Sequence, residues 1–163
     1  MCIGIRTRHA TEADGEEILE LWHGFTSYLS QFDERYEHSD QADERWLQYF
    51  ENQLVDSKYG TVLLAENDDD DEFLGVLEAR VMGDHPIFRL ANHGYINGMY
   101  VREDHRRKGI ASHLLDGAAE WFTEEPRDVE FYRIDVLAGE EDAAAMLESH
   151  GLEPVEYVYE QRL

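Results

Sequence analysis

The sequence predicts a mixed α/β (α+β) fold. Three observations lead to this prediction. Segments with alternating apolar residues, typical of half-buried strands, are interleaved with segments whose apolar residues recur every three or four positions, typical of helices. Hydrophobic residues make up 42% of the 163 residues and aromatic residues 12%, which is enough for one packed core. The expected order is strand, two helices, three strands, helix, strand, helix and strand.

The N-terminal part of the chain is expected to form one strand and two helices. Ile3 and Ile5 alternate with small or charged residues, which indicates a half-buried strand. Thr11 is a suitable N-cap for the helix that follows. The apolar stripe of this helix has spacings of three and four and consists of Ile18, Leu21, Trp22, Phe25 and Leu29. A second helix is predicted from Trp46, Phe50 and Leu54.

The middle of the chain is expected to form three strands. Residues 61–66 and 72–82 have the composition of strands and predict a hairpin. The turn between them, residues 67–71, contains four consecutive aspartates, which disfavour burial. Residues 95–102 predict a further strand, in which Gly98 indicates a bulge or a close approach of the backbone.

Two helices and two strands are expected in the last third. One helix begins near Gly109 and ends before Pro126, which cannot continue a helix. Residues 131–138 predict a strand, and residues 140–151 predict a helix that Gly151 closes. Residues 152–163 predict a final strand.

The charge of the chain excludes some functions. There are 37 acidic residues against 14 Lys and Arg, for a net charge of -23, and such a surface repels nucleic acid. Only Lys58 and Lys108 are lysines, and an acidic, lysine-poor surface predicts a protein adapted to high salt. An ordinary acidic protein is the alternative. No apolar run spans a bilayer and the single cysteine, Cys2, cannot form an internal disulfide, which favours a cytoplasmic location without a membrane partner.

A cluster of positive charge stands out on this acidic chain. Arg102, Arg106, Arg107 and Lys108 lie within seven positions, directly before Gly109 and an apolar helix. The first turn of a helix has unpaired N–H groups and partial positive charge, so that a strand, a glycine turn and a helix N-terminus can bind phosphate. A solvated basic turn is the alternative, and local spacing does not decide between them.

Other chemical motifs are missing from the sequence. No nucleotide-binding loop of the G-x-x-x-x-G-K-S/T type exists, and no G-x-G-x-x-G follows a strand. The eight histidines lack H-E-x-x-H spacing, and one cysteine cannot build a usual structural zinc site, so no metal site is predicted. No G-x-S-x-G elbow is present. His105 and His113 flank the basic turn and are expected to be ordinary surface and helix-face residues.

Residues 99–115, MYVREDHRRKGIASHLL, resemble the strand, turn and helix of the GCN5-related N-acetyltransferase (GNAT) superfamily. The family signature is Arg or Gln, two residues, Gly, one residue, and Gly or Ala. The positions that match it, and that the resemblance makes the pyrophosphate site, are Arg106, Arg107, Lys108, Gly109, Ile110 and Ala111. The order of elements over residues 1–163 also resembles the family, which implies a single N-acetyltransferase domain.

The resemblance further implies a strongly twisted mixed sheet that splays at its fourth strand to admit acetyl-CoA, the cosubstrate. The main chain of Met99 and Val101 would meet the pantetheine arm of the cofactor. The bulge expected at Gly98 would aim a backbone N–H at the thioester oxygen and stabilise the oxyanion.

The chain departs from the family at two positions. Glu140 stands where the family often has an asparagine that contacts the cofactor, and an acid at a helix N-terminus is favourable in any case. Leu147 replaces the tyrosine that protonates the thiolate in many members, and leucine cannot donate a proton. Tyr132, Tyr157 or water are the alternatives. The general base is equally open, with Tyr95, Glu78 and Asn97 as weak candidates for catalytic residues.

The function expected from these residues is acetyl-CoA-dependent transfer of an acetyl group to a primary amine of a small molecule or a peptide. The alternative is a non-catalytic acyl-CoA-binding or regulatory module. The resemblance also suggests a homodimer through the C-terminal strand. Aromatic residues of the first two helices are expected to line part of the acceptor cleft or to be core, namely Trp22, Phe25, Tyr28, Trp46 and Tyr49.

Overall fold

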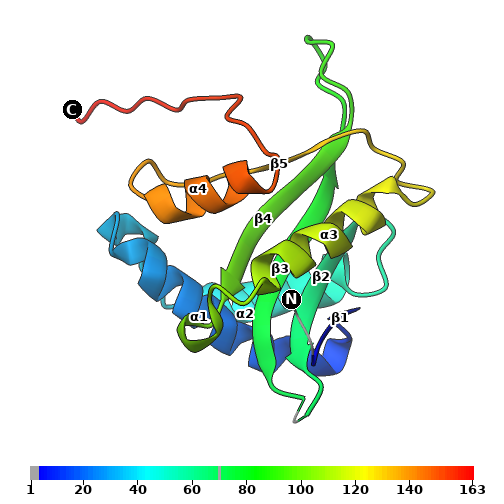
Figure 1. Ribbon diagram of the computed structural model, residues 1–163. Coiled ribbons are helices and arrows are strands. Elements are labelled where there is room, and N and C mark those ends of the chain that lie inside the picture. Colours follow the sequence, from blue (N-terminus) through cyan, green and yellow to red (C-terminus); the bar gives the residue numbers. More distant parts are fainter. Residues whose placement is uncertain (1–3, 70) are drawn as a thin grey trace.

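The strands form one five-stranded sheet with the order β1-β2-β3-β4-β5 (Figure 1). The structure is a computed structural model that describes residues 4–69 and 71–163, so that Cys2 and Ile3 lie outside the described residues. The first four strands are antiparallel neighbours, and β5 runs parallel to β4. Their bounds are β1 Ile5–His9, β2 Gly60–Asn67, β3 Phe73–Met82, β4 His93–Val101 and β5 Tyr132–Ile134.

Four α-helices accompany the sheet in the described part of the chain. They are α1 Gly15–Ser30, α2 Ala42–Tyr49, α3 Ile110–Thr123 and α4 Glu141–Ser149. Short 3-10 turns lie at η1 Glu12–Asp14, η2 Glu34–Tyr36 and η4 Glu103–His105, and a π-turn, η3 Phe50–Leu54, extends α2. None of the described helices is long and apolar enough to cross a membrane.

The sheet separates two apolar clusters because side chains of a strand point alternately to opposite faces. In β2, Leu63 and Ala65 belong to the cluster under α3, together with Leu114 and Phe122. Val62 and Leu64 belong to the cluster under α1 and η3, which contains the fully buried set Ile18, Leu21 and Phe50. The helical and strand periodicities of the sequence therefore correspond to the two faces of one sheet.

The sheet opens between β4 and β5. The two strands pair only from Gly94 to Ile96 on β4, opposite Tyr132 to Ile134, and the rest of β4 has no pairing to β5 in the described residues. The register with β3 shifts between Glu78 and Ala79, which leaves Asn97 as an extra residue beside Gly98. A Cβ on Gly98 would lie 3.2 Å from the Trp22 ring, so both the bulge and the close approach expected there are confirmed.

The final strand predicted for residues 152–163 is wrong, since these residues form no strand in the structure. The segment follows an extended course without pairing with β5 (Figure 1), and only Glu156 and Glu160 in it form ion pairs with described residues of the body, Arg133 and Arg35. Leu152 packs against the core under α3, but the later apolar side chains are exposed, Val158 to 93% and Tyr159 to 90%. Alternation in the sequence indicates the conformation of a strand but not the partner that a strand needs.

Candidate active site

The basic turn leads directly into α3. Gly109 is the N-cap of this helix and has a φ of 80°, in the left-handed region that favours glycine. The His113 N–H donates to the Gly109 carbonyl at 3.0 Å and begins the helical ladder. The N–H groups of Ile110, Ala111 and Ser112 therefore have no partner inside the helix. Because the Ile110 side chain is buried in the core, this residue can contribute to a site only through its backbone.

Arg106 is held in place by its neighbours. Its Nε donates to the Val101 carbonyl at 3.0 Å, and its guanidinium lies 5.0 Å from the Tyr28 ring centroid and 5.5 Å from that of Tyr100. Arg107 is exposed and has a φ of 62°, which is uncommon for a residue other than glycine. Within the described residues, neither Arg106 nor Arg107 forms an ion pair with a carboxylate. On a chain with 37 acids, positive charge left in this way is available to an anionic ligand.

The open edge of β4 carries backbone donors. The Arg102 N–H donates to the Leu74 carbonyl on β3 at 2.9 Å. Because successive N–H groups of a strand point to opposite edges, the N–H groups of Met99 and Val101 face away from β3, toward the side where β5 no longer pairs. Their side chains pack against the core under α3. The structure therefore brings the open edge of β4 and the basic turn onto one continuous segment, residues 99–111.

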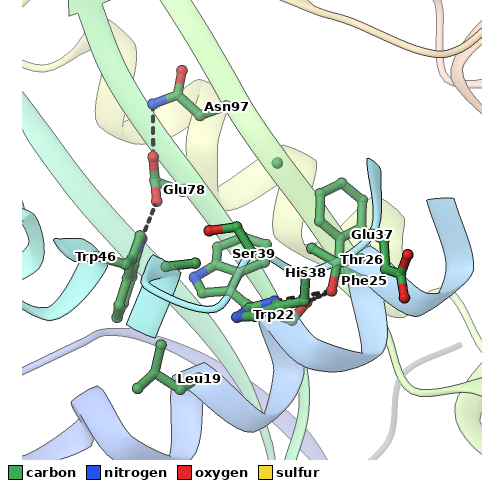
Figure 2. A pocket seen from close by; sticks show the side chains of 12 residues that line it. Leu19, Trp22, Phe25, Thr26, Glu37, His38, Ser39, Trp46, Glu78 and Asn97 are labelled. Atoms are coloured by element: carbon green, nitrogen blue, oxygen red, sulfur yellow. Dashed lines mark hydrogen bonds between the residues drawn. The ribbon is translucent and has the colours of Figure 1, made fainter. Parts of the chain in front are cut away.

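A pocket of about 250 Å³ lies next to the bulge at Gly98, between α1, the loop before α2, and strands β3 and β4 (Figure 2). Aromatic rings and acidic groups share its wall. The lining residues are Leu19, Trp22, Phe25, Thr26, Glu37, His38, Ser39, Ala42, Trp46, Glu78, Asn97 and Gly98.

Glu78 is the buried carboxylate of this pocket, with 6% of its surface exposed. Trp46 Nε1 donates to one carboxylate oxygen at 2.8 Å and Asn97 Nδ2 donates to the other at 2.7 Å, as Figure 2 shows. Arg80 Nε in turn donates to Asn97 Oδ1 at 3.2 Å. The charge of Glu78 also contributes to the raised pKa of Tyr49, although burial is the larger cause. Glu78 and Asn97, two of the predicted catalytic candidates, are thus brought together.

Tyr95, the third candidate, lies apart from the other two. It is outside the pocket lining, and its hydroxyl donates to Asp135 just after β5. Burial, followed by the hydrogen bond to Asp135, raises the pKa of Tyr95 to about 12. A phenol with this pKa is protonated at neutral pH, which makes it a poor general base.

The two positions that depart from the family pattern have structural roles. Glu140 is buried at the N-terminus of α4, where its Oε2 accepts a hydrogen bond from the Leu137 N–H at 2.6 Å. Burial raises the pKa of Glu140. Leu147 is 6% exposed and belongs to the core under α3. Of the tyrosines considered as substitutes, Tyr132 stacks on a core phenylalanine and Tyr157 is 77% exposed.

Several pocket residues were missed in the sequence. Of the five aromatics expected at the acceptor cleft, Trp22, Phe25 and Trp46 line the pocket and Tyr28 and Tyr49 do not. Thr26, Glu37 and His38 also line the pocket, and no motif or spacing pointed to them. Glu37 and His38 lie in the irregular segment between η2 and α2, where no periodicity exists to assign a side chain to a face.

Comparison with known proteins identifies the family of this fold. The model of the Acetyltransferase (GNAT) family matches residues 18–152, and the chain belongs to this family. Enzymes of this family use an acyl-CoA as the donor. A search of curated proteins finds no similar sequence.

Solved structures show the same fold at low identity. A mutant of the BH1408 protein from Bacillus halodurans is 18% identical, with a TM-score of 0.80 over 97% of this chain and 99% of that chain. The aminoglycoside antibiotic 6'-N-acetyltransferase AAC(6')-Ih from Acinetobacter baumannii is 18% identical, with a TM-score of 0.71 over 98% of each chain. AAC(6')-Iy, solved in complex with CoA, is 16% identical, with a TM-score of 0.73 over 98% of this chain and 94% of that chain.

Proposed function

We propose that the chain is an acetyl-CoA-dependent N-acetyltransferase that transfers the acetyl group directly to a primary amine of a small molecule or a peptide. One observation carries this proposal. The pocket residues Asn97 and Gly98 directly precede Met99, where the open edge of β4 begins. A donor bound along that edge and an acceptor bound in the pocket would meet at the bulge, so that transfer needs no carrier residue.

The donor side would bind acetyl-CoA through backbone groups and charge. The N–H groups of Met99 and Val101 suit the amide groups of a pantetheine arm, which would add to the sheet as an extended strand does. The pyrophosphate would lie at the N-terminus of α3, against the backbone of residues 106–111 and near the side chains of Arg106, Arg107 and Lys108. A backbone N–H at the bulge would stabilise the oxyanion that forms as the amine attacks.

The acceptor side suits a cationic amine. Glu37 and Glu78 supply negative charge, while Trp22, Phe25 and Trp46 supply ring faces for cation–π contact. The two hydrogen bonds from Trp46 and Asn97 hold the Glu78 carboxylate in one orientation. In this position Glu78 would bind the ammonium group and take its proton, directly or through a water molecule, before the amine attacks.

The thiolate of CoA would leave without help from residue 147. A thiol with a pKa of about 8.5 departs tolerably as the anion near neutral pH, whereas a general acid typically adds a factor of about 10² to 10⁴. Because Leu147 is part of the core, a phenol at this position would have to displace packed side chains.

The test is release of free thiol from acetyl-CoA across a panel of polyamines, aminoglycosides and peptides with a free N-terminus or lysine. At least one amine should be acetylated, and Glu78→Gln should lower kcat/KM by about 10²-fold or more with acetyl-CoA affinity unchanged. Glu37→Gln, at the exposed rim of the same pocket, is the matched control and should act mainly on KM. Acetyl-CoA binding with no acetylation of any amine would identify a non-catalytic acyl-CoA-binding module.

We also propose that the chain forms a homodimer through its C-terminal segment. Val155, Tyr157, Val158 and Tyr159 are exposed on an extended backbone, and only one edge of β5 is paired in the described residues. The segment of one copy would complete the sheet of a second copy. Light scattering should show a dimer for the whole chain and a monomer after removal of residues 153–163, whereas a monomeric whole chain would contradict the proposal.

A further inference from the structure

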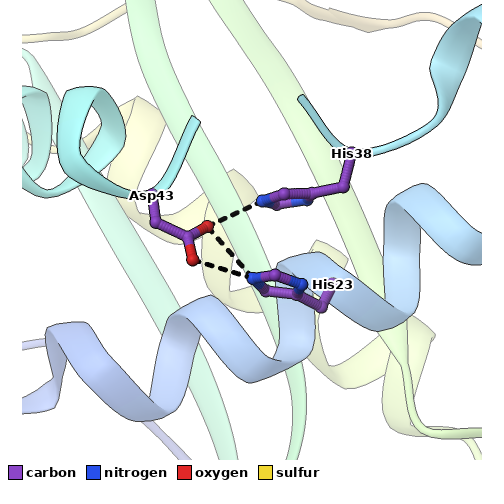
Figure 3. A group of neighbouring side chains, drawn as sticks. All are labelled: His23, His38 and Asp43. Atoms are coloured by element: carbon purple, nitrogen blue, oxygen red, sulfur yellow. Dashed lines mark hydrogen bonds and ion pairs between the residues drawn. The ribbon is translucent and has the colours of Figure 1, made fainter. Parts of the chain in front are cut away.

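Three polar side chains from separate elements meet beside the pocket (Figure 3). They are His23 on α1, His38 in the loop before α2, and Asp43 in the first turn of α2. His23 Nε2 lies 3.0 Å from both oxygens of Asp43, and His38 Nε2 lies 2.7 Å from Asp43 Oδ1. The imidazole rings are stacked, with centroids 3.8 Å apart and an angle of 19° between their planes. Two ring nitrogens and a carboxylate thus converge within 4.8 Å of one another.

Thr26 contacts the ring nitrogen of His38 that faces away from Asp43. The Thr26 hydroxyl donates to the Trp22 carbonyl at 3.1 Å, and a carbonyl can only accept. When the hydroxyl donates in this way, the oxygen of Thr26 can accept from His38 Nδ1, which lies 3.0 Å away. A neutral His38 in this tautomer has its lone pair on Nε2, facing Asp43 Oδ1.

In this tautomer the Nε2 lone pair and the carboxylate oxygen, 2.7 Å apart, repel each other unless a cation lies with them. One divalent ion would satisfy the Nε2 lone pairs of both histidines and the carboxylate together. The side-chain exposure of 51% for His23, 19% for His38 and 44% for Asp43 leaves the cluster open to an ion from solution.

We propose that His23, His38 and Asp43 form a binding site for a divalent transition-metal ion such as Zn²⁺. Neutral imidazole and carboxylate are the ligand types that zinc takes, and three protein ligands leave a coordination position for water. Thr26 has the part of an outer-shell partner that orients a ligating histidine. Bonds of about 2.0–2.2 Å in a tetrahedral site separate ligand atoms by about 3.3 Å. Asp43 therefore has to move by about 0.6 Å from His38 and by about 0.3 Å from His23, shifts that the exposed side chains of Asp43 and His23 allow.

The ion would connect α1 to α2 and to the loop that closes the pocket. His38 lines the pocket while its ring reaches the metal, so the ion fixes the position of one wall. This site is separate from the Glu78, Trp46 and Asn97 group. The inference does not depend on acetyl transfer, and its test requires no activity.

The test is calorimetric titration of the tag-free, metal-stripped protein with Zn²⁺, beside thermal unfolding with and without the ion. We expect one Zn²⁺ per chain and a higher thermal midpoint, because an ion that binds the folded state stabilises it. Bound Co²⁺ should show the visible absorption of a low-coordinate nitrogen and oxygen site. Excess Mg²⁺ should not displace either ion, since an attraction to the acidic surface alone would not distinguish these cations.

Variants separate this site from other surface groups. His38→Ala and Asp43→Asn should abolish the stoichiometric binding, and Thr26→Val should weaken it about 10- to 100-fold, the usual effect of losing an outer-shell partner. His150→Ala is the matched control, because His150 also faces a carboxylate, Asp116 at 3.2 Å, without a second imidazole. Absence of stoichiometric Zn²⁺ binding to the folded wild type, or equal binding by His38→Ala, would overturn the proposal. The three side chains would then be connected by hydrogen bonds alone.

Discussion

Two regions of the molecule concentrate arginine, and they differ in what the arginines contact. The first lies at β1, where Arg6 and Arg8 form hydrogen bonds with several carboxylates. Arg8 makes hydrogen bonds of 2.8 and 2.9 Å to Asp14 and of 2.6 Å to Glu66. The hydrogen bond with Asp14 is the main cause of a raised pKa of Arg8. Arg6 bonds to Glu66 at 3.0 Å, to Asp68 at 3.2 Å and to Asp71.

The second region is the basic turn before α3. Here Arg106 contacts two tyrosine rings and a backbone carbonyl, and no carboxylate balances it or Arg107 within the described residues. Glu66, Asp68 and Asp71 lie 58 to 65 positions from Arg6 and Arg8 in the sequence and contact them only because the fold brings them together, so the difference is one of geometry. Arg6 and Arg8, the neutralised region, are paired with acids and stabilise the fold. Arg106 and Arg107 have no acid partner in the described part of the chain and lie beside unpaired N–H groups, so they can bind an external anion.

The largest effect should follow from Gly109→Val, which we expect to abolish acetyl-CoA binding. A β-branched side chain would enter the space where the backbone approaches the pyrophosphate, and the φ of 80° disfavours valine as well. Gly151→Val is the matched control, because Gly151 also has a positive φ, 99°, and has open space where a Cβ would be.

Calorimetric titration with acetyl-CoA, beside circular dichroism to verify folding, measures both variants. Gly151→Val should bind as wild type does and lose only stability. Wild-type affinity in a folded Gly109→Val protein would end the model of a backbone phosphate site.

Added salt should raise the thermal midpoint of the protein but lower its affinity for acetyl-CoA. The Debye length falls from about 10 Å at 0.1 M to about 3 Å at 1 M, so potassium chloride screens the mutual repulsion of the acids. If the net charge of -23 reflects an adaptation to salt, the thermal midpoint should rise by several degrees between low and molar potassium chloride. Acetyl-CoA affinity should fall over the same range. A flat or decreasing midpoint in a thermal scan would refute the adaptation.

Arg107→Glu should weaken acetyl-CoA binding by about tenfold at low salt, less than Gly109→Val, because the backbone donors at α3 remain. The loss should shrink as potassium chloride is added. Arg6→Glu is the matched charge reversal in the neutralised region. It should lower the thermal midpoint by placing a further acid beside Glu66 and Asp71, and leave affinity unchanged. A larger loss for Arg107→Glu than for Gly109→Val would indicate a purely electrostatic patch.

Most of the fold and the glycine turn before α3 were predictable from the sequence because both depend on local pattern. The helical stripe that includes Ile18 and Leu21, and the alternation in β2, are properties of neighbouring residues, as is the turn that contains Gly109. The final strand was predicted by the same alternation and was wrong, since pairing is a property of two segments.

The pocket beside α1, by contrast, depends on contacts between distant segments. Trp46 and Glu78 are 32 positions apart and His23 and Asp43 are 20 apart, yet each pair is hydrogen-bonded. No spacing rule for a single helix or strand connects such positions. Glu78 and Asn97 could be recognised as polar strand residues, but only the bulge between β3 and β4 places them in one pocket.

The smallest effect should come from Asp14→Asn in the neutralised region. Asp14 is buried, and the hydrogen bond from Arg8 holds its pKa below the ordinary value of 3.8 in the folded protein. A carboxyl with a lowered folded pKa stabilises the protein above its unfolded pKa, and this contribution disappears as the pH falls through the folded pKa. The variant keeps an acceptor for the Thr11 N–H but loses the charge opposite Arg8. We expect a loss of about 1 kcal/mol in the free energy of unfolding at pH 7.

The pH dependence makes this prediction specific to the ion pair. The difference between wild type and Asp14→Asn in denaturant midpoint should be constant from pH 7 to about pH 5 and should narrow below about pH 4. Asp116→Asn, whose side chain is 76% exposed, should show little difference from wild type at any pH. A gap for Asp14→Asn that persists at low pH would mean that side-chain packing, and not the charge opposite Arg8, stabilises this end of the sheet. The neutralised region would then no longer be the electrostatic counterpart of the basic turn.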